Sequence, residues 1–228
     1  MEQLIFDLAD VEPASFANFL TGRNAEVVAT LQRLASGGVT ETGVLLWGPP
    51  GTGKTHLLKA TIAAAAARGA AAVVIAEPGE LLAADPETLG RNALVAVDAL
   101  DRADSGAQAR LFTLFNALRA RGGQLVAASR VPPATMALRE DLRTRLGWGL
   151  VYEVAPLADA EKPAALLAYA RQRGFGLPDD VIRYLLAHAR RDMPTLLRTL
   201  SSLDRHSLAT KRPITVPLVR GWLQRELR

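Results

Sequence analysis

The sequence of 228 residues contains no cysteine, which excludes disulfide bonds and thiolate metal sites. Its three histidines are scattered, and this argues against a zinc site. The longest apolar run, around Ala63–Ala67, is short and alanine-rich and cannot span a bilayer. The first ten residues, "MEQLIFDLAD", carry acids and lack the basic start of a signal peptide. These absences predict a cytoplasmic protein that does not contact a membrane.

The length and the charge of the chain limit its domain count and its possible partners less strictly. A chain of this length fits one large domain or a base with a small appendage, and 49% of its residues are apolar, enough for a proper core. The formal net charge is +4, and arginine far outnumbers lysine. Such mild basicity permits contact with nucleic acid or an acidic partner but requires neither, since a solvated arginine-rich surface explains it more simply.

Strand and helix patterns alternate through the first two thirds of the chain. Helical patterns include Lys54–Arg68 and Ala107–Arg121. Five short apolar runs bounded by turn residues predict strands at Thr42–Trp47, Ala71–Ala76, Ala93–Asp98, Gly123–Ser129 and Leu150–Val154. Continuous apolar strands suit a parallel sheet that is covered on both faces. The alternation therefore predicts an α/β fold with a doubly wound parallel sheet.

After Asp159 the strand patterns stop. Asp159 and Thr215 are expected to cap the first and the last of the helices that follow. Those helical patterns cover Ala160–Arg173, Pro178–Arg190, Pro194–Thr210 and Val216–Leu227. The predicted organisation is a short N-terminal segment at 1–10, an α/β base at 11–155 and an all-helical lid at 156–228.

A phosphate-binding motif follows the first predicted strand. The stretch "GPPGTGKT", Gly48–Thr55, fits G-x-x-x-x-G-K-[ST] and stands directly before a helix, the context that the motif requires. Gly51 and Gly53 permit the backbone angles of a loop whose N–H groups surround a phosphate. Lys54 is expected to reach the β- and γ-phosphates, and Thr55 to offer its hydroxyl to Mg²⁺. A chance glycine-rich turn is the alternative, but eight matching positions in this setting favour a site for ATP or ADP.

A second signal is Asp98, at the end of the third predicted strand. It is expected to lie beside Thr55 and to hold Mg²⁺ directly or through water. Ala99 follows, where an ATP-hydrolysing site usually has a second acid, and an alanine cannot act as a general base. Asp101 is the nearest remaining acid, and its position favours the next loop. We therefore predict nucleotide binding with weak or no intrinsic ATP hydrolysis.

The chain resembles the DnaA-like branch of the AAA+ class of P-loop proteins over essentially its whole length. "FANFLTGRN", Phe16–Asn24, is similar to the box that lines the adenine pocket, and "DLRTRLGWGLVYEV", Asp141–Val154, to the arginine-finger box. Arg190–Leu208 resembles the sensor-2 helix. The spacing and two further segments, "RGFGLPDDV" and "ITVP", are most similar to the Hda group of regulators, which inactivate the initiator DnaA. The resemblance implies a five-stranded parallel sheet with a C-terminal all-helical lid.

The resemblance assigns site residues. It implies that Arg145 is an arginine finger acting in trans on ATP held by DnaA, with a surface arginine paired to Asp141 or Glu140 as the alternative and Arg143 as a competitor. Together with the loop motif it predicts these nucleotide-binding residues: Asn24, Gly48, Pro49, Pro50, Gly51, Thr52, Gly53, Lys54, Thr55, His56 and Arg191.

Arg191 matches the sensor-2 arginine, which would reach from the lid to this chain's own nucleotide. An ion pair with Asp192 or a contact on the lid surface is the alternative. Arg190, one residue earlier, points about 100° away on a helix.

The N-terminal stretch "QLIFDL" resembles a peptide that docks into the polymerase sliding clamp, the β subunit. Gln3 would hydrogen-bond at a pocket rim, and Leu4, Phe6 and Leu8 would bury apolar side chains. Without the resemblance, an N-terminal strand packed on its own domain would be favoured. Because the sequence ends at Arg228, directly after the lid, no DNA-reading domain is expected, and DNA contact is expected mainly through the clamp.

Some positions depart from the pattern or stay open. Ser129 is expected to orient a water or a phosphate, and Arg130, where the family tends to have an acid, to add charge near the nucleotide or at an interface. Together with Ala99 these departures favour an ADP-bound form. Trp148, between two glycines, either packs at an interface or is buried at the lid hinge. A homodimer or a higher oligomer is compatible with the class.

The resulting hypothesis is a regulator of replication initiation. In its ADP-bound form, and with the DNA-loaded clamp, it would stimulate ATP hydrolysis by DnaA and act in trans more than as an enzyme. The alternative is an ATPase of the helicase-loader or DnaA type that handles single-stranded DNA. That alternative predicts an acid after Asp98 and a helicase-binding N-terminus, and the sequence has neither.

Overall fold

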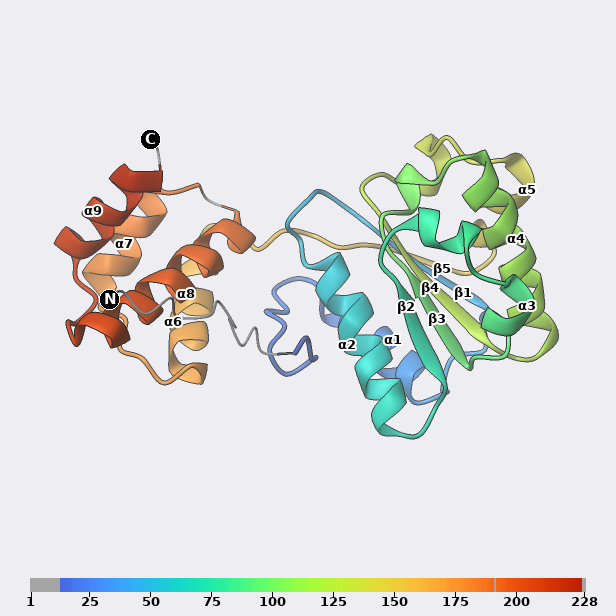
Figure 1. Cartoon of the computed structure of the whole chain (residues 1–228), viewed down its shortest axis with the longest axis horizontal. Coiled ribbons are helices and arrows are strands. Elements are labelled where there is room, and N and C mark those ends of the chain that lie inside the picture. Colours follow the sequence, from blue (N-terminus) through green and yellow to red (C-terminus); the bar gives the residue numbers. More distant parts are fainter. Residues whose placement is uncertain (1–12, 191, 227–228) are drawn as a thin grey trace, which may run out of the picture.

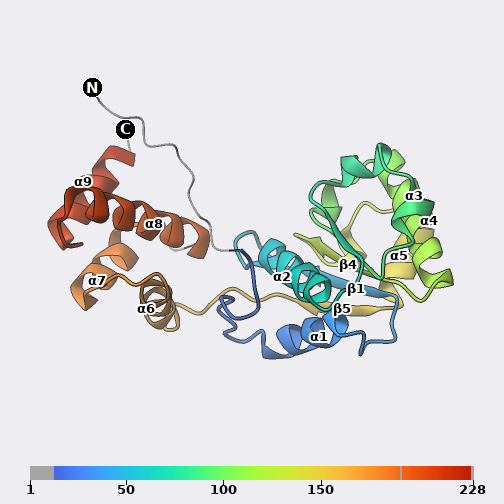
Figure 2. The same ribbon diagram turned by 60° about the horizontal axis from the view of Figure 1, so that its bottom comes forward.

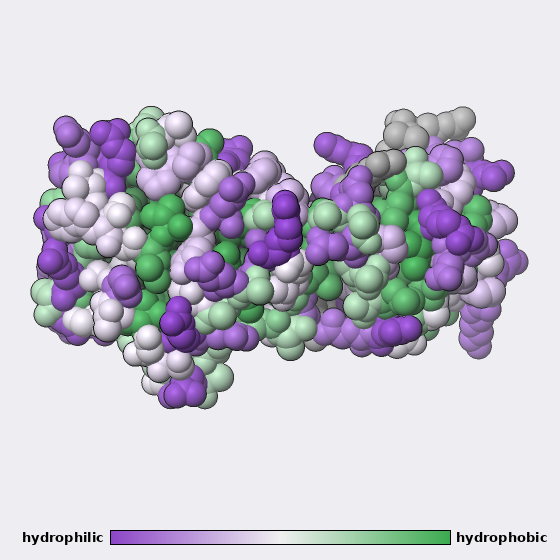
Figure 3. Space-filling view, turned by 180° about the vertical axis from the view of Figure 1, so that it is seen from behind, coloured by the Kyte–Doolittle hydropathy of each residue, from purple (hydrophilic) through white to green (hydrophobic). Residues whose placement is uncertain are grey.

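The protein has two lobes (Figure 1). The computed structural model describes residues 13–190 and 192–226, with a sheet and its flanking helices in the base and a helical lid beside it. The last strand of the base ends at Glu153 and the first lid helix begins at Lys162. Seen from behind, the lobes meet at a narrower waist, with the base on the left (Figure 3). No helix in the described part of the chain is long and apolar enough to cross a membrane.

The base is built on a five-stranded, all-parallel sheet, as predicted. Its strands have the order β2-β3-β4-β1-β5. They are β1 Gly43–Trp47, β2 Ala72–Ile75, β3 Leu94–Val97, β4 Gln124–Ser129 and β5 Leu150–Glu153, each within one residue of its prediction. In the register, Trp47 lies opposite Ser129, and Val97 opposite Ala127. The segments that leave β1, β3 and β4 therefore emerge side by side at one edge of the sheet.

Helices cover both faces of the sheet, because alternate strand residues point to opposite sides (Figure 2). Val44 and Leu46 of β1 pack with α1 and α2, whereas Leu45 packs with α4 and α5. The base helices are α1 Ala25–Ala35, α2 Lys54–Ala67, α3 Pro86–Leu89, α4 Ser105–Ala120 and α5 Glu140–Gly147. Short 3₁₀ turns lie at Pro78–Leu82, Leu100–Arg102 and Pro133–Thr135.

The lid has its own apolar core, to which all four predicted helices contribute. They are α6 Lys162–Gln172, α7 Asp179–His188, α8 Met193–Thr210 and α9 Val216–Glu226. The prediction that Asp159 caps the first is wrong, because Glu161 holds that position. Asp159 instead accepts a 2.6 Å hydrogen bond from the Lys162 ammonium. Thr215 directly precedes α9, and its carbonyl accepts the N–H of Val219.

Candidate functional site

The phosphate loop connects β1 to α2. Two of its glycines have left-handed backbone angles, with φ of +83° at Gly51 and +91° at Gly53. A Cβ on Gly53 would lie only 2.7 Å from the ring of Phe19, so the segment before α1 packs directly on the loop. The loop ends where α2 begins at Lys54, which turns the free N–H groups of the helix toward the loop. This geometry suits an anionic ligand.

Lys54 is 8% exposed and lies within the loop. Its ammonium donates hydrogen bonds to the carbonyls of Gly48 at 2.7 Å and Pro49 at 2.8 Å. Burial lowers the pKa of Lys54, while the charges of Asp98 and Asp101 act in the opposite direction. The ammonium thus donates to loop carbonyls and lies within the electrostatic influence of Asp98 and Asp101. When a nucleotide binds, a phosphate oxygen would take the place of the carbonyls as the hydrogen-bond acceptor.

The two residues expected to hold Mg²⁺ touch one another. The Thr55 hydroxyl donates to Oδ2 of Asp98 at 2.5 Å, across 43 residues of sequence. Oδ1 of Asp98 accepts the N–H of Ala99 at 2.7 Å. A hydroxyl and one carboxylate fit Mg²⁺, which takes oxygen ligands, retains waters and is completed by phosphate oxygens. The described residues contain no cluster of three or more acidic, histidine or cysteine ligands.

Two neighbouring cavities meet at the phosphate loop. The phosphate-end cavity, of about 470 Å³, is lined by Lys54, Thr55, Asp98, Asp101 and Arg130 among others. The apolar cavity, of about 280 Å³, lies between the segment before α1, the loop and the lid, and its lining includes Phe19, Asn24, Leu157, Met193 and Leu197. Gly51, Gly53, His56 and Pro194 line both. A charged compartment that opens beside an apolar one matches the two ends of a nucleotide.

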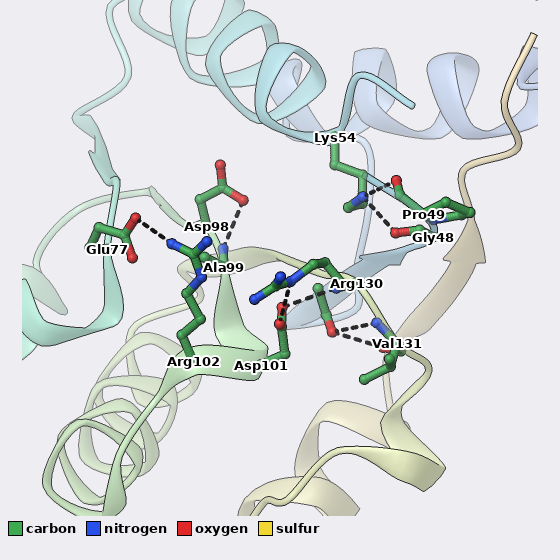
Figure 4. Close-up of polar contacts among 11 residues, drawn as sticks. Gly48, Pro49, Lys54, Glu77, Asp98, Ala99, Asp101, Arg102, Arg130 and Val131 are labelled. Atoms are coloured by element: carbon green, nitrogen blue, oxygen red, sulfur yellow. Dashed lines mark hydrogen bonds and ion pairs between the residues drawn. The ribbon is translucent and has the colours of Figure 1, made fainter. Parts of the chain in front are cut away.

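Asp101 belongs to the phosphate-end cavity rather than to a separate loop (Figure 4). Its carboxylate, 13% exposed, accepts the backbone N–H of Arg130 at 3.0 Å and the guanidinium Nε–H at 2.8 Å. Burial alone would raise the pKa of Asp101, but these two donors outweigh it and hold the pKa below 3.8. An acid with a depressed pKa is a weak base, so Asp101 does not replace the acid missing at Ala99.

The Asp101–Arg130 pair predicts a pH-dependent stability. The pKa of Asp101 is lower in the folded than in the unfolded protein. The ionised carboxylate therefore adds fully to the free energy of unfolding above the unfolded pKa of about 4, and this stabilisation is lost as pH falls through the lower folded pKa. We expect Asp101→Asn to lower the free energy of unfolding by about 1–2 kcal/mol at neutral pH. The stabilities of the two proteins, measured by denaturant titration, should converge as the pH falls through the lowered pKa of Asp101, and a pH-independent difference would contradict the assignment.

Ser129 lines the phosphate-end cavity, and its hydroxyl also bonds within its own turn. Its hydroxyl donates to the carbonyl of Val131 at 2.8 Å and accepts the N–H of Val131 at 3.1 Å. Both capacities of the hydroxyl are used by the turn after β4. At this strand end it is Arg130 that carries the charge facing the phosphate-end cavity.

Asn24 and His56, both predicted to bind nucleotide, connect parts of the protein. Asn24 is 3% exposed, and its side-chain amide donates to the carbonyl and accepts the N–H of Ala155. It therefore fastens the start of α1 to the segment that leads into the lid. His56 Nε2 lies 2.8 Å from the Ser15 carbonyl, and its ring lies 5.6 Å from that of Phe19. Both residues line the apolar cavity, but their polar atoms bind the protein itself.

The lid meets the phosphate loop through the start of α8. Pro194 approaches Gly51, where a Cβ would be 3.3 Å from the proline ring. Asp192 caps α8 by accepting the N–H of Thr195 at 2.9 Å, and Arg190 lies 3.9 Å from the Asp192 carboxylate. Arg191, the predicted sensor-2 residue, lies outside the described residues. So do Gln3, Leu4, Phe6 and Leu8 of the predicted clamp-binding segment.

Arg145 lies on α5, in the base, and lines neither nucleotide cavity. It borders a separate open groove of about 660 Å³, the finger groove, which Arg139, Glu140, Asp141, Thr144 and Trp148 also line. Figure 1 shows α5 at the end of the base away from the lid. None of the ion pairs among the described residues includes Arg145 or Glu140, and Asp141 pairs with Arg139 at 2.8 Å. The alternative of a pair with Asp141 or Glu140 is wrong.

The structure corrects one expectation near Arg145 and adds contacts that the sequence did not predict. Trp148 is 61% exposed beside Arg145, so a tryptophan buried at the lid hinge is wrong. The Arg145 guanidinium lies 4.5 Å from the ring centre of Phe112, a contact between α5 and α4 that the sequence did not indicate. Glu77 and Arg102 form a 3.1 Å ion pair at the phosphate-end cavity. The lid residues of the apolar cavity are ordinary apolar helix positions and give no local signal.

Comparison with known proteins adds family information. A family model described as the Hda lid domain matches residues 159–223. Among solved structures, the fold matches domain III of the replication initiation protein DnaA from Thermotoga maritima, with a TM-score of 0.82 and 19% identity over 93% of this chain and 96% of that one.

Two longer proteins share the fold. DnaA from Aquifex aeolicus, bound to AMPPCP, gives a TM-score of 0.74 and 20% identity over 84% of this chain and 65% of that one. The RuvB Holliday junction branch migration motor of Thermotoga maritima gives 0.69 and 20% over 93% and 72%. The present chain thus spans about two thirds of the length of the Aquifex initiator. Residues 159–223 thus match the Hda lid domain, and the chain as a whole has the fold of DnaA domain III.

Proposed function

We propose that the chain is a regulator of replication initiation that, bound to ADP and the DNA-loaded sliding clamp, stimulates ATP hydrolysis by DnaA. The observation that carries this proposal is Arg145, a guanidinium with no carboxylate partner among the described residues, on an open groove apart from the chain's own nucleotide cavities. The Hda lid match supports a role in initiation control. DnaA bound to AMPPCP shares the fold, which supports nucleotide binding here.

The chain's own site is arranged to hold a nucleotide and not to cleave it. Lys54 and the loop N–H groups would bind the phosphates, and Thr55 and Asp98 would hold Mg²⁺, which neutralises phosphate charge. Ala99 supplies no base, and Asp101 is occupied by Arg130. Because the apolar cavity is lined by both lobes, a bound nucleotide would bridge base and lid. In this proposal ADP is a bound component of the regulator.

Arg145 performs the regulatory step in this proposal. Its guanidinium would enter the phosphate pocket of a neighbouring DnaA and stabilise the charge that develops on the transferred phosphoryl group. Water attacks the γ-phosphorus of the initiator's ATP, the bond to the β–γ bridging oxygen breaks, inorganic phosphate and a proton are released, and DnaA is left with ADP. Mixing the chain with DnaA, DNA-loaded clamp and labelled ATP should raise the rate of phosphate release above that of DnaA alone. No increase at any concentration of the chain would contradict the proposal.

The N-terminal segment gives a separate prediction about clamp recruitment. We expect the double change Leu4→Ala and Phe6→Ala to lower clamp affinity by at least about tenfold, since buried apolar anchors dominate such contacts. Surface plasmon resonance against immobilised clamp measures the effect. Ile5→Ala is the matched control, because Ile5 is outside the anchor pattern and should leave affinity unchanged. Full clamp binding by the double variant would count against this mode of recruitment and favour a helicase-loader type of protein.

A further inference from the structure

Two aromatic rings surround the guanidinium of Arg145. Its central carbon lies 4.5 Å from the ring centre of Phe112 and 5.9 Å from that of Trp148. Phe112 lies in the middle of α4, and Trp148 is the C-cap residue directly after α5. The guanidinium carbon of Arg139 lies 5.8 Å from the ring centre of Phe112, and that of Arg119 lies 5.7 Å from the ring centre of Trp148. Arginine and aromatic side chains thus alternate beside the finger groove.

Arg145 differs from its neighbours in what holds it. Arg139 is neutralised by Asp141 and is partly fixed by that ion pair. Arg145 has no carboxylate within reach among the residues described, and the aromatic faces are its side-chain partners. Arg143, the other candidate finger, has no aromatic ring within cation–π distance in the described chain. The aromatic contact therefore singles out Arg145.

An aromatic face and a carboxylate hold an arginine in different ways. A carboxylate takes up the N–H donors, whereas a ring attracts the plane of the guanidinium and leaves its five N–H groups free. A flexible arginine also loses much rotamer freedom when it must be ordered at a partner. A guanidinium already positioned on a ring loses less, and it presents all its donors to a phosphate.

Phe112 is suited to be the fixed part of this arrangement. It is half-buried and packs against the core cluster beneath α4 and α5, which includes Leu142 and Leu146 of the finger helix. Trp148 is 61% exposed, so it forms an outer wall that a partner surface would cover. The Phe112 ring is thus held by the core of the base, whereas the Trp148 ring is exposed where a partner protein would bind.

We propose that Phe112 is a positioning residue that holds the Arg145 guanidinium extended, with its donors free, for the terminal phosphate of a partner's ATP. Trp148 closes the other side of this aromatic cradle. The inference rests on the proposed function, since the cradle matters only if Arg145 acts in trans. It assigns a role in phosphoryl transfer to a residue that would never touch the nucleotide.

The test replaces the ring and keeps the apolar bulk. Phe112→Leu should lower the maximal rate of DnaA ATP hydrolysis, at saturating concentration of the chain, by about 2- to 30-fold. The concentration that gives half-maximal stimulation should stay within about twofold, because docking is unchanged. Phe112→Tyr keeps the ring and should restore the rate. A thermal melt of each variant verifies that the base remains folded.

A double-mutant cycle shows whether Phe112 acts through Arg145. In the Arg145→Ala background, Phe112→Leu should cause no further loss. A Leu variant as active as wild type, a Tyr variant as weak as Leu, or a further loss in the Arg145→Ala background would each overturn the positioning role. Full stimulation by Arg145→Ala alone would instead contradict the proposed function, so the two failures are distinguishable.

Discussion

Arg145→Ala should reduce the stimulation of DnaA ATP hydrolysis by about 10³-fold or more, the effect of losing an arginine finger in other phosphoryl-transfer systems. The reason is local. Within the described structure, Arg145 has no carboxylate partner. The other basic residue that lines the finger groove, Arg139, is paired with Asp141 and so cannot take its place. The measurement is phosphate release from DnaA in the presence of DNA-loaded clamp. Clamp affinity should be unaffected, because Arg145 is not part of the predicted clamp-binding segment, which is Gln3–Leu8.

Arg143→Ala is the matched control for this result. Arg143 lies on the same helix two residues earlier and carries the same charge, but it lies outside the residues lining the finger groove. Its loss should change the stimulated rate by less than about threefold, the size expected of a screened surface charge. Equal losses from Arg143→Ala and Arg145→Ala would show that net charge on α5, and not one finger, carries the effect.

Ala99→Asp should convert the chain's own site into a measurable ATPase. A correctly placed general base contributes on the order of 10²–10⁴-fold to a rate. Ala99 lines the phosphate-end cavity, and its backbone is already left-handed, with φ of +50°. Aspartate and asparagine tolerate that conformation better than alanine, so the new side chain enters without a backbone change. Single-turnover hydrolysis of ATP by the chain alone should rise on the order of 10²-fold.

Ala99→Asn separates chemistry from conformation in this experiment. The amide has the shape of the carboxylate and the same preference for left-handed angles, but it cannot accept a proton. It should stabilise the turn to a similar degree and leave ATP hydrolysis at the wild-type level. An Asn variant as active as the Asp variant would mean that relief of backbone strain, and not a base, controls the rate.

The base and the lid follow largely from local sequence patterns. Strands buried on both faces are short, continuous apolar runs, so five of them could be located to within one residue. The loop motif follows β1 and Asp98 follows β3, two strands that flank β4, and the side chains of Thr55 and Asp98 meet at this edge of the sheet as predicted. Such features depend on chain periodicity and on a motif with fixed geometry, both of which are visible in a single sequence.

Contacts between distant segments could not be predicted in this way. The Asp101–Arg130 pair joins residues 29 apart, and only the strand order β3-β4 brings them together. Ser129 was expected to orient a water or a phosphate, and it lines the phosphate-end cavity, but its hydrogen bonds to the N–H and the carbonyl of Val131 were not foreseen. Phe112 lies one helix away from Arg145, and nothing in either helix alone indicates that they touch. Side-chain pairing across elements decides these details.

The most direct test follows one labelled ATP molecule. DnaA is loaded with radiolabelled ATP, free label is removed, and the chain is added in its ADP form with DNA-loaded clamp and excess unlabelled ATP. A single turnover then reports only on the nucleotide that the initiator carried. We predict rapid release of label with the wild-type chain and release at the unstimulated rate with Arg145→Ala. Equally fast release with both chains would contradict the claim that this guanidinium completes the site of another protein.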